Sequence, residues 1–237
     1  MRSTFLLFFC CLLCAVAQAQ AIDSTARTAT QYALARYEAT NSGPERLYNG
    51  IEYIGYDRRL TVHPFFGSDS MQNGSIYAGE QVFTIPLLYD IVRDEVVLAH
   101  PTGYRMALHS DHIQSFSVQG HTFIRRADST RQGLPTGFYD LLYDGPTQLL
   151  ARHTKTIVVN PSANGTYGVF DPKTTYFIRK SGHYFPIKNK RTLLTVLDDG
   201  KKQLTASMRK EKLKFKLTID DSFGKMARYY DELSYTL

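Results

Sequence analysis

Residues 75–98, SIYAGEQVFTIPLLYDIVRDEVVL, decide the fold class of this chain. Short runs of β-branched and aromatic residues alternate here with turn residues, at Ala78-Gly79 and at Arg93-Asp94. This alternation is typical of β-hairpins, in which a tight turn joins two antiparallel strands. The same pattern extends from Leu47 to Ile187, with further turn residues at Asn49-Gly50, Asp144-Gly145 and Ser181-Gly182.

Helical periodicity occurs on both sides of this region but not between its predicted strands. Residues 23–41 predict one amphipathic helix, and residues 190–233 predict two or three, with an alternating, extended segment at 213–219. Parallel β-α-β units are not expected, because they need a helix between consecutive strands. The sequence therefore predicts a mainly β (α+β) fold, an antiparallel meander or a partly closed barrel, with one N-terminal helix and two to three C-terminal helices.

Residues 1–19 have the three parts of a secretory signal peptide. Arg2 gives the positive start, residues 5–17 form an apolar run, and small residues at 15, 17 and 19 give acceptable cleavage sites. The run of about 13 residues is shorter than the roughly 20 that a membrane-spanning helix needs. We therefore expect an exported protein, located in the periplasm or at the cell surface.

The three cysteines all lie inside this apolar run, at positions 10, 11 and 14. After cleavage the mature chain would contain none, which excludes disulfide-stapled modules, thiolate nucleophiles and cysteine zinc sites. Acylation of Cys14 in a lipoprotein is the alternative. We expect three segments: a signal peptide (1–19), an N-terminal helix plus antiparallel β domain (20–188), and a C-terminal helical segment packed on that domain (189–237).

The basic character of the chain comes from one segment. Residues 179–216 contain 12 Lys and Arg but three Asp and Glu, whereas the rest of the mature chain is slightly acidic. Such a segment could attract an anionic envelope component, such as an anionic polymer or acidic lipid head groups, or an acidic partner protein, or it could be plain solvated surface. No nucleic acid is expected as a partner. The candidate binding residues are Lys201, Lys202, Arg209, Lys210, Lys214 and Lys216.

A histidine-rich stretch is the candidate for chemistry. His109, Asp111 and His112 are followed by His121, and imidazole and carboxylate side chains are ligands for zinc. In a strand, however, positions 109 and 112 point to opposite faces; they would converge only in a short helix between residues 107 and 116. The chain lacks a nucleophile-elbow motif, a phosphate loop and a dinucleotide fingerprint. We therefore expect no catalytic residue, metal ion or cofactor.

An ordered set of motifs over most of the mature chain resembles a family of uncharacterised exported proteins of Gram-negative bacteria. The family has no established activity, so the resemblance implies an envelope location and no site residue. His63 and His121 belong to the shared pattern, whereas His109 and His112 do not. The motifs are Leu47–Tyr53 (LYNGIEY), His63–Phe66 (HPFF), Gly74–Gly79 (GSIYAG), Ile85–Asp90 (IPLLYD), Gly120–Phe123 (GHTF), Gly137–Gly145 (GFYDLLYDG) and Tyr229–Asp231 (YYD).

The function predicted from the sequence is a non-catalytic binding or structural component of the bacterial cell envelope. One alternative is a metal-assisted hydrolase that uses His109, Asp111, His112 and His121. Another is a carrier of a small apolar ligand, which would require the sheet to close around a cavity.

Overall fold

The computed structural model describes residues 47–127, 133–162, 165–210 and 219–234, which belong to a compact unit running from residue 47 to 237. The predicted signal peptide and N-terminal helix lie outside the described residues, as does most of the predicted extended segment at 213–219. Ile219, which we expected to end that segment, instead begins helix α4 (Ile219–Ser234).

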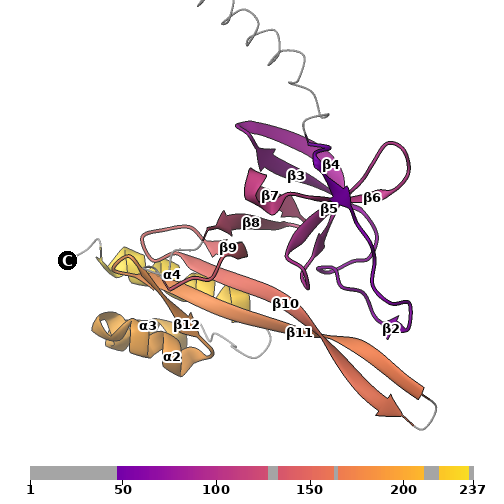
Figure 1. Ribbon diagram of the computed structural model, residues 1–237. Helices are drawn as coiled ribbons and strands as arrows, with labels where there is room; N and C mark the ends of the chain where they lie inside the picture. Colours follow the sequence, from indigo (N-terminus) through magenta and orange to yellow (C-terminus); the bar gives the residue numbers. More distant parts are fainter. Residues whose placement is uncertain (1–46, 128–132, 163–164, 211–218, 235–237) are drawn as a thin grey trace, which may run out of the picture. The chain divides into compact units, whose positions relative to one another are not determined.

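In the described residues twelve strands form one open sheet, and eleven of them follow the order β1-β6-β5-β4-β3-β7-β8-β9-β10-β11-β12 (Figure 1). Neighbours in this order pair antiparallel, and the short strand β2 pairs with β11 in parallel. The predicted mainly β, antiparallel-dominated fold is confirmed. The sheet is not closed, and its one parallel contact was not predicted. The strands are β1 (Gly50–Glu52), β2 (Leu60–Thr61), β3 (Gln72–Ala78), β4 (Gln81–Asp90), β5 (Glu95–Ala99), β6 (Arg105–Leu108), β7 (Ile113–Val118), β8 (His121–Arg126), β9 (Gly137–Tyr143), β10 (Leu149–Ser162), β11 (Gly165–Lys180) and β12 (His183–Ile187).

Two-residue turns join three of the hairpins. Both residues of each turn have positive φ: 54° and 65° at Gly79-Glu80, 53° and 80° at Gln119-Gly120, and 52° and 80° at Ser181-Gly182. This is the type I′ geometry, whose twist matches that of the flanking strands, and glycine adopts positive φ without steric cost. The sequence placed the last of these turns correctly and the first within one residue.

Strands β10 and β11 form a long two-stranded ribbon (Figure 1). The Lys155 N–H points away from β11, since it donates to the Ile91 carbonyl at 3.1 Å. Alternate residues of β10 face the same edge, so Pro161 faces outward too, and Pro172, directly opposite Lys155, faces the other edge. A proline has no N–H to offer there. The ribbon therefore loses no internal hydrogen bond, and both edges are blunted against pairing with other chains.

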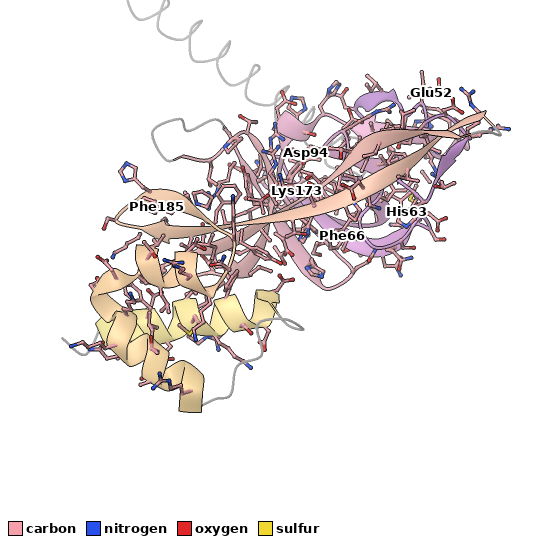
Figure 2. All side chains as sticks on the ribbon, turned by 90° about the horizontal axis from the view of Figure 1, so that it is seen from below. Glu52, His63, Phe66, Asp94, Lys173 and Phe185 are labelled. Carbon is pink, nitrogen blue, oxygen red and sulfur yellow. The ribbon has the colours of Figure 1, made fainter. Side chains whose placement is uncertain are left out.

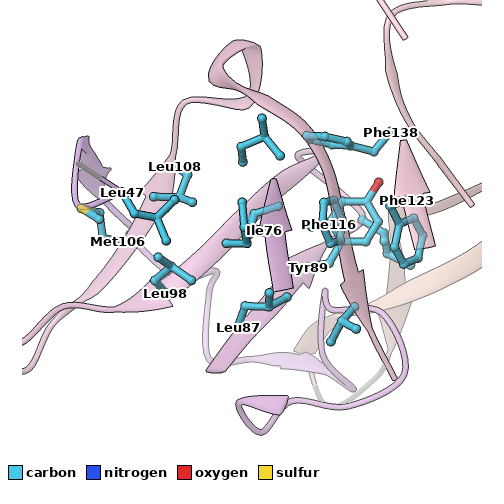
Figure 3. Packing of buried hydrophobic residues seen from close by; sticks show 14 residues of the cluster. Leu47, Ile76, Leu87, Tyr89, Leu98, Met106, Leu108, Phe116, Phe123 and Phe138 are labelled. Atoms are coloured by element: carbon cyan, nitrogen blue, oxygen red, sulfur yellow. The ribbon is translucent and has the colours of Figure 1, made fainter. Parts of the chain in front are cut away.

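The largest apolar cluster fills one face of strands β3 to β9 (Figure 3). The rings of Phe116 and Phe123 stack with centroids 4.9 Å apart, and Tyr89 packs on both. On β5, Val96 contributes to this cluster while Val97 packs in another on the opposite face. Burial on both faces explains the continuous apolar run of β5, which does not alternate as a half-exposed strand would.

Helices α2 (Lys190–Val196), α3 (Lys201–Lys210) and α4 cover the other end of the sheet, on β9 to β12. Asn189 caps α2, since its side chain accepts from the Thr192 N–H at 3.0 Å. The buried stripe of α4, Phe223, Met226, Ala227 and Tyr230, packs against apolar residues of β10 to β12. The two to three C-terminal helices predicted from the sequence are therefore confirmed as three in the described residues.

A buried carboxylate, Asp90, fixes the loop after β1 to the sheet. Its Oδ2 accepts from the hydroxyls of Tyr53 (2.8 Å) and Tyr56 (2.9 Å), and its Oδ1 accepts from the backbone N–H groups of Val92 and Arg93. The Arg93 guanidinium lies over the Tyr56 ring, 4.3 Å from its centroid, and donates to the Ile54 carbonyl at 2.7 Å. Asp90 has no exposed surface, so these donors supply the interactions that water would otherwise provide.

A second carboxylate in the same turn, Asp94, accepts from the Tyr89 hydroxyl at 2.6 Å and from the Phe138 N–H. Burial raises the pKa of Asp94, although these donors and nearby arginines act in the opposite direction. Its φ of 62° is one that asparagine tolerates well. An Asp94→Asn variant therefore keeps the shape and the backbone while removing the charge.

We expect Asp94→Asn to change how stability depends on pH. A carboxyl with a raised folded-state pKa stabilises the fold most when protonated, and this contribution is lost as the pH rises through that pKa. The free energy of unfolding of the wild type, relative to the variant, should therefore fall as the pH rises above about 4, the ordinary pKa of an aspartate. Urea titrations across this range measure it. A difference that stays constant or rises with pH would contradict the prediction.

Candidate functional site

The candidate binding site lies on the two helices that follow the sheet. A depression of about 510 Å³ opens to solvent beside α2 and the start of α3 and is lined by Asn189, Lys190, Arg191, Leu194, Thr195 and Lys201. Lys202 and Arg209 are exposed further along α3. We call Lys190, Arg191, Lys201, Lys202 and Arg209 the basic surface; all five residues are exposed.

The acidic residues beside the basic surface are engaged within the chain. Asp198 and Asp199 form the turn between α2 and α3, and the Lys180 Nζ lies 2.9 Å from an oxygen of each. The Tyr230 hydroxyl also donates to Asp199, at 2.7 Å. The hydrogen bond from Lys180 holds the pKa of Asp198 below its usual value, and for Asp199 the bonds from Lys180 and Tyr230 outweigh the opposing effect of burial. Both carboxylates therefore stay ionised at neutral pH and stay bound to Lys180.

The cations of the basic surface have few such partners. Within the described part of the chain, Arg191, Lys201, Lys202 and Arg209 take part in no ion pair. These four side chains therefore present positive charges to solvent that no ion pair with a described residue offsets.

Of the six residues predicted for binding, three can be placed. Lys201, Lys202 and Arg209 are exposed on α3, as their positions opposite the apolar residues predicted. Lys210 ends α3, but its side chain lies outside the described residues, as do Lys214 and Lys216. Lys190 and Arg191 were not among the predicted binding residues, although they belong to the same basic run. The helix-capping residue Asn189 could have indicated them in the sequence. It marks the start of α2, so Lys190 and Arg191 fall in the first turn of this helix, about one turn before Leu194.

The histidine cluster of the alternative metal-assisted hydrolase does not form as a group of four. His109, Asp111 and His112 are exposed around a single 3-10 turn, Ser110–His112, and the two imidazole centroids lie 5.8 Å apart. His121 lies on β8 and its Nδ1 contacts a different carboxylate, that of Asp140. No group of three His, Cys, Asp or Glu side chains suited to a metal ion occurs in the ranges that the structure describes.

Asp140 instead holds two histidines from neighbouring strands. Its Oδ2 lies 2.6 Å from the His121 Nδ1 and 3.2 Å from the Nε2 of His153, and its side chain is 2% exposed. The other ring nitrogen of His153 lies 3.1 Å from the Thr174 hydroxyl. These four side chains, which we call the histidine–carboxylate line, cross β8, β9, β10 and β11.

An aromatic ring covers the histidine–carboxylate line. The ring of Phe66 lies with its centroid 5.0 Å from both imidazoles, and its loop is tied down by Lys155, whose Nζ donates to the carbonyls of His63 and Phe65. His63 and Phe66 can be followed in Figure 2. Burial is the main cause that lowers the pKa of Lys155. Asp140 and Thr174 contact ring nitrogens of the two histidines, and Phe66 packs against both imidazole rings. We therefore interpret the histidine–carboxylate line as a structural link between these strands.

We expect Asp140→Ala to lower the free energy of unfolding by about 2–4 kcal/mol, because two imidazole N–H groups lose their buried acceptor. Urea unfolding of the variant measures this loss. Asp111→Ala is a matched control, since Asp111 is exposed and lies 3.9 Å from a histidine, His112. The control should change stability by less than about 0.5 kcal/mol. Equal losses in both variants would contradict the structural role of Asp140.

Two further findings bear on function. Among the described residues, no helix is both long and apolar enough to span a membrane. Comparison of the chain with protein-family models, with curated proteins and with solved structures finds no match. The site must therefore be interpreted from its own geometry and charge.

Proposed function

We propose that this chain is an exported, non-catalytic binding component of the Gram-negative cell envelope, and that the basic surface of α2 and α3 holds an anionic partner. The observation that carries the proposal is the concentration of exposed lysines and arginines around the depression, while the neighbouring Asp198 and Asp199 are both bound by Lys180. Opposite charge brings such a partner to the surface and holds it there.

The envelope location is part of the proposal and rests on the signal-peptide pattern and on the resemblance to uncharacterised exported proteins. Mass spectrometry of the exported protein should give an N-terminus at Gln18 or Gln20, because signal peptidase cleaves after small residues such as Ala17 and Ala19. An acylated Cys14 as the first residue would contradict this prediction and identify a lipoprotein.

The other two functions considered for the sequence are less well supported. A carrier would need a closed sheet around a cavity, whereas this sheet is open and phenylalanine, leucine and isoleucine side chains fill its largest cluster. The metal-assisted hydrolase loses one of its ligands, because His121 contacts Asp140 instead of the turn that carries His109 and His112.

Co-sedimentation with insoluble Gram-negative envelope material tests the proposal. The mature protein should sediment with this material at low salt and be released as the salt concentration approaches about 0.5 M, because added ions screen the exposed charges. Retention that does not depend on salt, or no retention at any salt concentration, would overturn an electrostatic role for the basic surface.

A further inference from the structure

The spacing of the cations on the basic surface indicates what size of anionic partner it can contact. Lys202 and Arg209 are seven residues apart in α3, so they lie on the same face of the helix and about 10 Å apart along its axis. Arg191 and Lys201 line the depression at the start of α3, and Arg209 lies near the opposite end of this helix. A single phosphate or carboxylate is too small to contact both ends at once, whereas a chain with repeated charges can.

The apolar residues described beside the basic surface are buried, which bears on whether its partner is a lipid bilayer. The described leucines of α2, α3 and the turn between them, Leu193, Leu194, Leu197 and Leu204, are at most 7% exposed and pack in the helix–sheet cluster. Helices that lie on a bilayer keep an apolar face for the acyl chains, in addition to their basic face. In the described part of α2 and α3 these leucines pack inside the protein, and of them Leu194 also borders the depression, so a bilayer would meet mainly the charges of the described surface.

We propose that the partner is a hydrophilic polymer with repeated anionic groups, and not a small anion or a lipid bilayer. This inference rests on the proposed function, since it specifies which anionic partner the basic surface takes. Each cation that contacts such a polymer releases a counterion, so the logarithm of the affinity falls with the logarithm of the salt concentration, with a slope that counts the contacts. Three or four contacts give a slope of roughly −2 to −3, whereas a single ion gives a slope near −1.

The experiment measures binding of the mature protein to four probes at the same concentration of negative charge. The probes are long-chain polyphosphate, polygalacturonate, inorganic phosphate, and vesicles of phosphatidylcholine with 30% phosphatidylglycerol. We expect at least one polymer to bind tenfold or more tightly than vesicles and inorganic phosphate, with the steeper salt slope. The two polymers distinguish phosphate from carboxylate as the group recognised.

The remaining outcomes contradict the inference in distinguishable ways. Vesicles that bind as tightly as the tighter-binding polymer would overturn the polymer assignment but leave the proposed function standing. Inorganic phosphate that displaces the polymers at equal charge would show a single-anion site instead. If neither polymer nor vesicles bind, the proposed function itself fails. The variant Lys202→Glu/Arg209→Glu should weaken polymer binding without lowering the melting temperature, since both side chains are exposed.

Discussion

Replacing Asp90 with alanine is expected to lower the free energy of unfolding by roughly 3–5 kcal/mol, the largest loss we expect from a single substitution in this chain. The variant leaves the hydroxyls of Tyr53 and Tyr56 and two backbone N–H groups without their buried acceptor. The loop that Arg93 and the two tyrosines hold against the sheet should loosen with it. Equilibrium urea unfolding measures the loss.

One further variant separates the hydrogen-bond acceptor of Asp90 from its charge, and a second serves as an exposed control. Asp90→Asn keeps one oxygen acceptor and should cost less than Asp90→Ala. Asp57→Ala removes an exposed carboxylate that is bound by Arg59, and it should change stability by less than about 0.5 kcal/mol. If Asp90→Ala unfolds at the same urea concentration as Asp57→Ala, the buried network contributes nothing measurable and our account of this loop is wrong.

Asp90 also shows where prediction from the sequence stops. Local patterns predicted the hairpins, because the turn residues Ser181 and Gly182 and their flanking strands are neighbours in the chain. They predicted the buried stripe of α4 for the same reason. The donors to Asp90 from Tyr53 and Tyr56, however, come from 37 and 34 residues away. No local pattern marks which aspartate two distant tyrosines will meet.

The histidines show the same limit within the candidate site. The sequence grouped His121 with His109 and His112, since they lie within 13 residues of one another. Strand pairing instead brings β8 beside β9 and β9 beside β10, which places His121 and His153 on either side of Asp140. The basic segment was easier to predict, because its charge is a property of composition and its helices expose that charge locally.

Reversing two charges of the basic surface should have the largest effect on binding. Lys201→Glu/Lys202→Glu is expected to weaken binding to an anionic polymer at least tenfold at low salt, because it turns two attractive contacts into repulsive ones. The fold should remain intact, since both residues are exposed. They also lie in the first turn of α3, where negative side chains interact favourably with the helix dipole.

The matched control is Arg58→Glu/Lys173→Glu, which changes the net charge of the protein equally at two exposed residues outside α2 and α3. Weakened binding in the control would show that total charge, and not position, governs retention. Circular dichroism and urea unfolding of both variants show whether a loss of binding reflects a loss of structure.

The measurement that tests our central claim most directly compares the wild type and these two variants in one titration against long-chain polyphosphate or polygalacturonate, whichever the wild type binds, at about 50 mM salt. Our account predicts that the control binds within about threefold of the wild type, while Lys201→Glu/Lys202→Glu binds at least tenfold more weakly and with a shallower salt dependence. Equal affinities for the two variants would contradict the claim that the basic surface of α2 and α3 is the binding site.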